Sequence, residues 1–373
     1  MFLAWAEIRR TKVRFGLLIG AVALLVFLIL FQYTIQNSLI RGFVGGVRNQ
    51  NAPVLVFDVD GRRTPQASTI SPSLQQAIRS VGGVGRTAAL WSLTFPVAAG
   101  KKTTATTVVG YADAGIGGID SLSAGRQPRS AGEAIANASD VDLGFGLGAT
   151  IVVAPKGPTL TIVGIAEDID INVIPTVFVE QATYLEVLRA RNPAATLPDP
   201  NVIGAVPTAG VAPAELARRI NAADENLDAL TKADAADRNP GVASIRQSFN
   251  IIFVLFALVV PLVTGLFFVI LTFQKASSLT LLRAFGAPAR RLVASLLVQV
   301  FVVIGFGLAL GIAGYFPLTR QRLGSLPLRF ETTAVLGWSA LLAGLSVISS
   351  LAAIRRVLKI DPIEATTGAG VRT

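Results

Sequence analysis

Four long uncharged stretches constrain this chain more than any other feature. Residues 251–273, 292–316 and 334–354 contain no charged side chain, and residues 15–31 contain no polar side chain either, with an extension to residue 35. A bilayer is crossed by about 20 apolar residues, whereas a core helix of a soluble protein rarely stays uncharged on every face for so long. The sequence therefore predicts four transmembrane helices, at 15–35, 251–273, 292–316 and 334–354.

The first stretch resembles a signal peptide in position but exceeds the usual apolar core of about 7–15 residues. No A-x-A-like cleavage site follows it, so we expect a retained anchor. Residues 1–14 alternate apolar and charged side chains, which favours an amphipathic helix in the inner headgroup region with Trp5 at the interface. An ordinary basic flank is the alternative for this segment.

The charge distribution predicts the topology. The chain has a net charge of +10, yet residues 36–250 carry 18 basic and 19 acidic side chains. The positive excess lies mainly in residues 1–14, in the loop 274–291 and in the tail 355–373, which the positive-inside rule places in the cytoplasm. Both termini are then cytoplasmic, and residues 36–250 and the short loop 317–333 lie outside. A nucleic-acid binder would concentrate its charge on a soluble face, so that class is excluded.

The region 36–250 is predicted to fold as a large α+β domain. It contains no cysteine, so disulfides do not hold it together. Local patterns predict strands near residues 53–59, 103–111, 176–179 and 201–206, a hairpin of 149–153 with 159–165, a hairpin tip at 100–103, and helices at 72–80 (with Ser71 as N-cap), 181–191 and 213–223. Residues 192–200 are expected to be a loop, and residues 233–242 a polar, Gly/Pro-containing return to the membrane.

Most catalytic chemistry is excluded by composition. The chain has no histidine and no cysteine, which removes Ser-His triads, thiol nucleophiles and ordinary zinc sites. No GxxxxGK[ST] motif occurs. The acidic pairs and clusters at 58–60 and 167–170 suit solvated turns better than cation sites. We expect no enzymatic activity and no cofactor in this chain, so that any ATP and Mg²⁺ would be bound by another subunit.

The loop 274–291 has the sequence QKASSLTLLRAFGAPARR, with no acidic residue. Leu279, Leu282 and Phe285 recur at spacings of three and predict a short amphipathic helix. Gly286 allows a break before Pro288 starts a second helix. A partly apolar helix at the cytoplasmic surface is predicted to dock onto a cytoplasmic partner.

The same loop and the tail carry a family resemblance. The loop resembles that of FtsX-like ABC-transporter permeases, most closely the macrolide-exporter and lipoprotein-release type, whose segment reads ALLRA-G followed by basic residues. Phe285 departs from the Leu or Ile common there. Asp361-Pro362 in the tail is similar to the closing "DP-EAL" motif of that family. The residues that the resemblance assigns to ATPase coupling are Leu279, Leu281, Leu282, Arg283, Ala284, Phe285, Gly286, Arg290, Arg291, Asp361 and Pro362.

The resemblance implies a homodimeric or heterodimeric permease of the bacterial cytoplasmic membrane with two copies of a separate ATPase. ATP-driven motion would pass along the membrane helices to the outer domain and export or release a substrate, with an outer adaptor and membrane lipid as further partners. The alternative is an FtsX-like signalling module that regulates a cell-wall hydrolase. The length of the outer region favours export.

The third apolar stretch contains a GxxxG motif, Gly307 and Gly311. Small residues at this spacing allow two helices to approach closely. The contact is within one subunit or between two, and we favour the first.

Overall fold

The computed structural model describes residues 12–100, 102–155, 157–274, 289–323 and 326–358. These residues divide into two compact units. The helical unit comprises the described residues of 1–36, 248–321 and 328–373, and the sheet unit those of 37–247 and 322–327.

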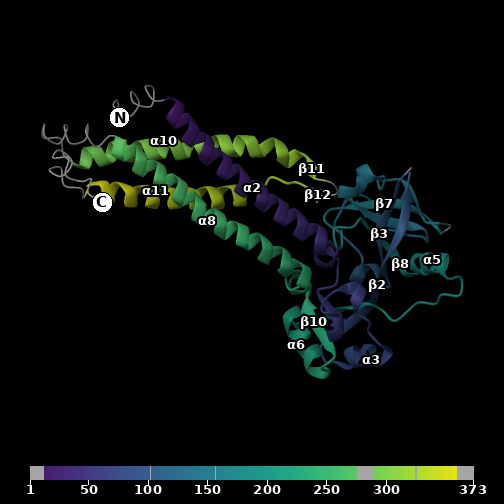
Figure 1. Ribbon diagram of the computed structural model, residues 1–373. Helices are drawn as coiled ribbons and strands as arrows, with labels where there is room; N and C mark the ends of the chain where they lie inside the picture. The colour runs from purple at the N-terminus through teal and green to yellow at the C-terminus, as the bar shows by residue number, and fades with distance from the viewer. Residues whose placement is uncertain (1–11, 101, 156, 275–288, 324–325, 359–373) are drawn as a thin grey trace, which may run out of the picture. The chain divides into compact units, whose positions relative to one another are not determined.

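Four long helices carry the apolar stretches (Figure 1). They are α2 (Lys12–Asn49), α8 (Pro240–Gln274), α10 (Ala289–Tyr315) and α11 (Thr332–Leu358). In the described residues, Phe15–Asn49, Pro240–Leu266 and Val298–Arg320 are long and apolar enough to cross a membrane, while Thr332–Ile348 is a shorter apolar helix. Three of the predicted spans thus lie on helices of sufficient length, and the fourth stays a prediction.

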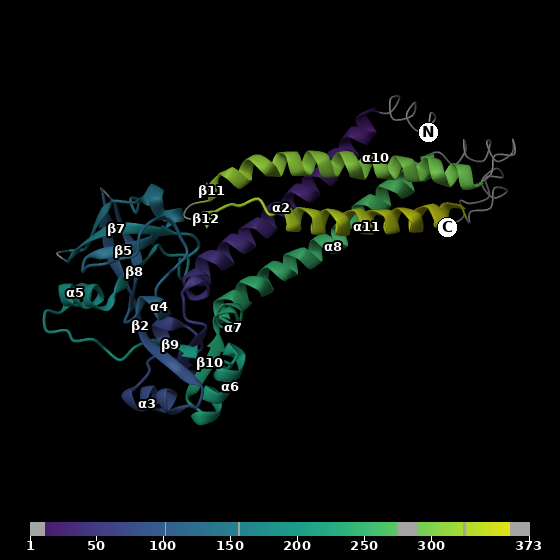
Figure 2. The ribbon, with the colours of Figure 1, turned by 180° about the vertical axis from the view of Figure 1, so that it is seen from behind.

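The helical unit has its own core, formed where α2 meets the other helices. Phe15, Val22 and Ile29 of α2 are buried together with Val303 of α10 and Leu342 of α11. Both ribbon views show α2 running beside α8 and α10 in this region (Figures 1 and 2). The outward surfaces are apolar: α8 exposes Ile251, Val254, Leu255, Leu258, Leu262 and Leu266. An apolar surface of this extent suits lipid and not water.

A mixed sheet forms the centre of the sheet unit. Its order in the described residues is β10-β1-β9-β2-β3-β8-β5-β7-β4, and β6 pairs with both β2 and β7. The pairs β3–β8 and β5–β7 are parallel and the others antiparallel. The strands are β1 (Val54–Asp58), β2 (Val84–Ala99), β3 (Lys102–Tyr111), β4 (Leu122–Gly125), β5 (Glu133–Asn137), β6 (Thr150–Val153), β7 (Thr159–Ala166), β8 (Thr176–Glu180), β9 (Val202–Pro207) and β10 (Leu227–Thr231).

The locally patterned elements form where the sequence predicts them. The helix α3 (Pro72–Ser80) begins after Ser71, whose side chain accepts a hydrogen bond from the backbone of Leu74. The helices α5 (Gln181–Arg191) and α6 (Pro213–Ala223) also have the predicted bounds. The hairpin of β6 with β7 is confirmed, as is the tip between β2 and β3, where Ala99 pairs with Lys102.

Short segments complete the described chain. In the sheet unit they are η1 (Val59–Gly61), η2 (Pro65–Ala67), α4 (Ala114–Gly117), η3 (Ala138–Leu143) and α7 (Lys232–Asp237). The loop 317–333 contains η4 (Phe316–Arg320) and the two-residue strands β11 (Arg322–Leu323) and β12 (Leu326–Pro327).

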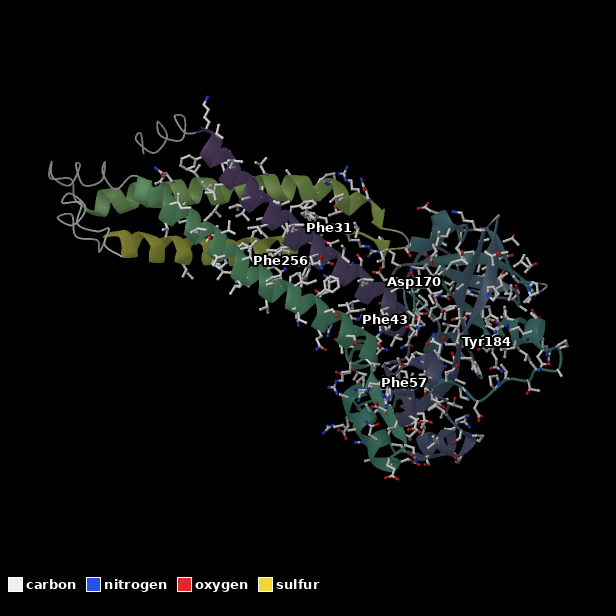
Figure 3. All side chains as sticks on the ribbon, in the orientation of Figure 1. Phe31, Phe43, Phe57, Asp170, Tyr184 and Phe256 are labelled. Carbon is white, nitrogen blue, oxygen red and sulfur yellow. The ribbon has the colours of Figure 1, made fainter. Side chains whose placement is uncertain are left out.

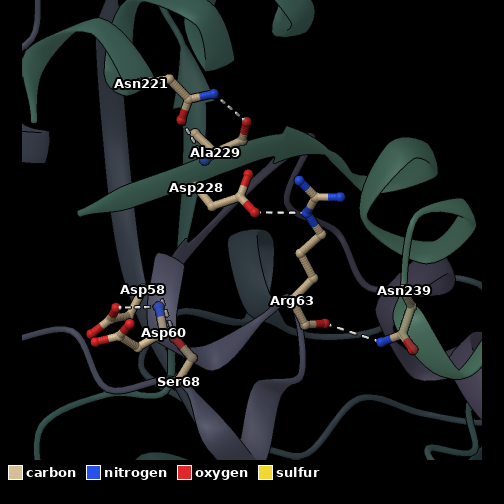
Figure 4. A network of polar contacts seen from close by, with 8 residues as sticks. All are labelled: Asp58, Asp60, Arg63, Ser68, Asn221, Asp228, Ala229 and Asn239. Carbon is tan, nitrogen blue, oxygen red and sulfur yellow. Dashed lines mark hydrogen bonds and ion pairs between the residues drawn. The ribbon is translucent and has the colours of Figure 1, made fainter. Parts of the chain in front are cut away.

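The segment 233–242, predicted as a polar return to the membrane, is largely helical. It contains α7 and the first turn of α8. Thr231 caps α7 by accepting from the backbone of Asp234, and Asn239 Oδ1 accepts from the backbone of Gly241 at 2.9 Å. Figure 4 shows that Asn239 also donates to the carbonyl of Arg63, at 3.0 Å. Side-chain caps therefore make helices of a segment whose composition resembles a loop.

Candidate functional site

The predicted coupling element lies between two described helices. The helix α8 ends at Gln274 and α10 begins at Ala289. Residues 275–288 lie outside the described residues, and so do Asp361 and Pro362. Arg290 and Arg291 fall in the first turn of α10. The role of the coupling residues therefore stays a prediction.

The glycines of the GxxxG motif lie on the face of α10 that meets α2 of the same chain. A Cβ on Gly311 would lie 2.7 Å from the carbonyl oxygen of Ala23 and 2.8 Å from Val26, and one on Gly307 would lie 2.5 Å from Val22. By contrast, a Cβ on Gly305 would meet nothing within 4 Å. The absence of side chains at 307 and 311 allows the two backbones to approach this closely.

Two polar side chains of the helical unit form hydrogen bonds within it. The hydroxyls of Thr34 on α2 and Tyr315 at the end of α10 share a hydrogen bond of 2.6 Å. Thr264 donates to the carbonyl of Val260 one turn earlier, at 2.8 Å. The predicted spans contain no Asp, Glu, Lys or Arg. The spans therefore offer none of the ionised groups that ion-coupled carriers place at mid-depth.

In the sheet unit, the end of α2 is bonded to a loop that follows β7. Gly46 N–H donates to the carbonyl of Asp170 at 3.0 Å, while Asn172 and Val173 donate backbone N–H groups to the carbonyls of Phe43 and Gly42. In a regular helix, the carbonyls of Phe43 and Gly42 would accept from N–H groups of α2 itself. Here they accept from the loop instead. We call residues 42–46 and 168–173 the helix-end joint.

The joint depends on glycine and on unusual backbone angles. A Cβ on Gly45 would lie 2.3 Å from the carbonyl oxygen of Asp168, which is closer than any side chain permits. Asp168, Asn172 and Val173 have φ values of 54°, 57° and 59°, in the left-handed region that is unfavourable for a β-branched residue such as Val173. Backbone strain of this kind persists only when the surroundings over-determine it.

A buried polar cluster adjoins the joint. The Asp170 side chain, labelled in Figure 3, lies near Ser139, whose Oγ is 3.1 Å from Asp170 Oδ2 and 3.2 Å from Asp140 Oδ1. Asn137 Nδ2 donates to Ser139 Oγ at 2.8 Å. Asp140 and Asp170 are 1% and 6% exposed. Burial raises the pKa of the Asp170 carboxyl to about 6, although hydrogen bonds from Asn137, Asp140 and Ser139 act in the opposite direction.

Ion pairs connect the outer ends of the two helices that enter the sheet unit. Asp237 of α7 accepts from Arg48 near the end of α2 at 2.6 Å and from Arg246 near the start of α8 at 2.8 Å. All three side chains are about half exposed. One carboxylate thus bridges two arginines on different helices, although exposed pairs each contribute only about 0–1 kcal/mol.

A second ion pair closes the segment before β5. Arg126 and Glu133 form two parallel bonds, the one to Oε2 being 2.7 Å long. The Arg126 guanidinium, together with the backbone N–H of Arg129, lowers the pKa of Glu133 to about 2. The pair holds the turn between β4 and β5.

The carboxylates of the acidic segments 58–60 and 167–170 do not come together around a common cation site. Asp58 Oδ1 accepts from the backbone of Asp60 at 2.9 Å, as expected of a strand-ending turn. Asp170 is buried beside Ser139, whereas Asp168 lies in the joint with its carbonyl bonded to Asn49. Among the described residues, no group of three or more His, Cys, Asp or Glu side chains could hold a metal ion.

Comparison with known proteins gives a family assignment. Residues 250–362 match the model of the FtsX-like permease C-terminal family. The chain is 21% identical over 383 residues to the "Putative hemin transport system permease protein HrtB" of Staphylococcus epidermidis, covering 99% of each chain. A protein of the same name from Staphylococcus haemolyticus is 26% identical over 129 residues, 33% of this chain and 35% of the relative.

Two solved structures are similar to part of the chain. The periplasmic region of MacB from Actinobacillus actinomycetemcomitans covers 50% of this chain and 92% of its own, with 13% identity and a TM-score of 0.36. The extracellular domain of the noncanonic ABC-type transporter YknZ from Gram-positive bacteria covers 48% of this chain and 99% of its own, with 14% identity and a TM-score of 0.32. Likenesses of this size establish neither a shared fold nor a shared function.

The matched region contains α10, the described part of α11 and most of α8, with the apolar surface described above. Together with the relative that matches over 99% of its length, this region makes the chain similar to the FtsX-like ABC permeases. These similarities and the apolar helices support a permease component of an ABC-type transporter in a bacterial membrane.

Proposed function

We propose that this permease couples ATP hydrolysis by a separate ATPase to the export or extracytoplasmic release of a substrate by mechanical transmission. The observation that carries the proposal is the continuity of two helices. The helix α2 is unbroken from Lys12 to Asn49 and α8 from Pro240 to Gln274, so that each contributes residues to both units. A helix that moves at one end displaces the other, because its backbone hydrogen bonds resist bending. This holds best for α2, since Pro261 removes one such bond from α8.

The ends of these two helices in the sheet unit are held by several independent contacts. The helix-end joint bonds the backbone of α2 to residues 168–173, and Asp237 pairs with both Arg48 and Arg246. A displacement of either helix would therefore reach the loop after β7 and α7 directly. We propose that these contacts receive the motion.

At the other end, the predicted coupling helix would receive the motion of the ATPase. Leu282 and Phe285 would bury apolar surface in a groove of that subunit, and Arg283, Arg290 and Arg291 would pair with acidic residues at its rim or with lipid phosphates. Burial of one such side chain contributes roughly 1.5–3 kcal/mol. Two ATPases and a second permease copy complete the proposed assembly.

We propose an amphiphile or a peptide as the exported substrate. The relatives are named for hemin transport, and hemin is one amphiphile of this kind. The chain has no histidine or cysteine, which are common protein ligands of haem iron. If hemin is carried, this subunit holds it by its periphery and not through those ligands. The transport names of the relatives favour export over regulation of a hydrolase.

Co-purification with the cognate ATPase tests the proposal. Phe285→Ala and Leu282→Ala should each weaken the complex about ten-fold or more, since 1.4 kcal/mol corresponds to a factor of ten. Leu147→Ala, which truncates an exposed leucine of the sheet unit, is the matched control and should change nothing. If both loop variants retain complex formation and transport-linked ATP hydrolysis, the loop is not the coupling element.

A further inference from the structure

A cavity of about 220 Å³ lies beside the end of α2 within the sheet unit. It is lined by side chains from three turns of α2, residues 40–49, and by Asp168 of the helix-end joint. The space is roomy enough for several waters. It is large enough for a small polar group with the first carbons of a chain, and too small for a whole drug-sized molecule.

The lining combines positive charge with aliphatic surface. Arg41 and Arg48 are seven residues apart, which places them two turns apart on one face of α2. Ile40 and Val44 supply aliphatic surface between them, and both are largely buried. Asp168 is the one acidic residue of the lining. The lining therefore has one positive charge in excess, with aliphatic carbon beside it.

Two ion pairs adjoin the lining. Asp237 accepts from Arg48 but also from Arg246, so one carboxylate serves two guanidinium groups. Counting Asp168, Arg41, Arg48 and Arg246 with it, the group of five has a net charge of +1. Guanidinium groups bind carboxylates and phosphates through paired N–H donors. An anion on an aliphatic stem is the ligand chemistry that matches.

The position of these residues in the sequence places them close to lipid. Arg41 follows Ile35, the last residue of the first predicted span, by six residues, and Arg246 precedes Ile251, the first residue of the second, by five. Under the proposed topology, both belong to the outer surface of the membrane. Anionic headgroups with attached acyl chains are present at that level.

We infer that the cavity beside Arg41 and Arg48 binds the anionic headgroup, phosphate or carboxylate, of an amphiphile. This inference rests on the proposed function for the side of the membrane on which the cavity opens. The amphiphile is either an anionic phospholipid of the outer leaflet or a molecule on its way to export. Both present the same chemistry to the two arginines.

Binding to the purified full-length chain in a neutral detergent tests the inference, without the ATPase. The probe is dodecyl phosphate, measured by calorimetric titration for the natural chain and for Arg41→Gln, Arg48→Gln and the matched control Arg79→Gln, an exposed arginine of α3. Loss of a charge-assisted hydrogen bond should weaken binding about ten-fold or more in the first two variants. The control should bind dodecyl phosphate as the natural chain does.

Two further probes separate head from tail. Dodecylphosphocholine and inorganic phosphate should each bind at least ten-fold more weakly than dodecyl phosphate, because one lacks net charge and the other lacks the aliphatic stem. Arg41→Lys should recover part of the affinity, since it restores the charge without the paired donors. Equal affinity across the arginine variants, or equal affinity for either probe, would overturn the inference.

Mass spectrometry of the chain released from nanodiscs distinguishes the two sources. The discs contain phosphatidylglycerol and phosphatidylcholine in equal amounts. Retention of phosphatidylglycerol that Arg41→Gln abolishes identifies a phospholipid as the ligand. Arginine-dependent binding of dodecyl phosphate without such retention identifies a diffusible amphiphile. Neither result depends on the ATPase, so a failure here leaves the coupling proposal to its own experiment.

Discussion

At Asp170 a carboxyl group is buried next to the backbone bond that holds the end of α2. Its carbonyl accepts from Gly46, and its side chain lies in the cluster with Ser139 and Asn137. Because burial raises its pKa to about 6, above the ordinary value of about 3.9, the folded state binds more protons than the unfolded state between these two values.

The contribution of Asp170 to the stability of the sheet unit should therefore decrease as pH rises from about 4 to about 6. The limiting slope for one proton is about 1.4 kcal/mol per pH unit. Urea unfolding of residues 37–247 at a series of pH values measures it, and Asp170→Asn should remove this part of the dependence. Glu133, whose pKa is lowered, acts only at lower pH. An identical pH profile for the natural domain and Asp170→Asn would contradict the assignment.

Gly45 is the second residue on which the helix-end joint depends. Gly→Ala inside a helix ordinarily stabilises by about 0.5–1 kcal/mol, but a Cβ here would meet two backbone atoms of Asp168, at 2.3 and 2.8 Å. Gly45→Ala should destabilise by about 1–3 kcal/mol. Gly42→Ala is the control, because its nearest neighbour is a Leu326 side-chain atom at 3.4 Å. The midpoint of thermal unfolding should fall for Gly45→Ala and rise for Gly42→Ala. Equal midpoints in the two variants would disprove the close approach of Gly45 to Asp168.

At the scale of the element, the pairing of α2 with α10 depends on small residues. Gly311→Val should separate the two helices, because its Cβ would meet the backbone of Ala23 as well as Val26. Overpacking of this kind costs about 1–3 kcal/mol. The thermal midpoint of the purified chain in detergent should fall by several degrees. Gly305→Val, on an open face of the same helix, should leave the thermal midpoint unchanged. An equal fall in that variant would show that the contact between α2 and α10 is not the cause.

At the scale of the whole molecule, the charge distribution predicts which side of the membrane each part occupies. Cysteines introduced singly at Ser121 and Ser277 into this cysteine-free chain should differ in intact cells. An impermeant thiol reagent should label the first, which is exposed in the sheet unit, and not the second. Labelling of Ser277→Cys alone would show that the topology is the reverse of the predicted one, and it would contradict the export proposal.

The sheet unit should also fold without the membrane helices. It has its own buried clusters, one around Phe95, Phe145 and Tyr184 and another around Phe57 and Leu55. Residues 37–247 expressed alone should unfold cooperatively in urea, followed by the fluorescence of the buried Trp91. A broad, non-cooperative loss of signal would show that the helical unit is required for its folding.

Local signals in the sequence predicted the elements that depend on neighbouring residues. Ser71 followed by Pro72 predicts the start of α3, because a cap and a proline act within one turn. The strand β2 was not predicted. It contains Gly85 and Pro96 and alternates poorly, and it forms because β9, β3 and β6 pair with it. The strand β3 follows it directly across the predicted tip, but β6 and β9 are distant in the sequence, so the full extent of β2 is not indicated by a local pattern.

Hydrophobic stretches, charge asymmetry and the absence of histidine and cysteine by themselves determined the membrane class and the exclusion of most enzymes, while the motifs of the loop 274–291 and of the tail carried the family resemblance. These properties depend on transfer energies and on composition, which do not require knowledge of contacts. The tertiary structure decided that Gly311 faces α2 and that Asp170 is buried beside the end of that helix. It also decided that Arg41, Arg48 and Asp168 line one cavity. Each of these depends on residues that are distant in the sequence and meet only when packing and sheet pairing place them together.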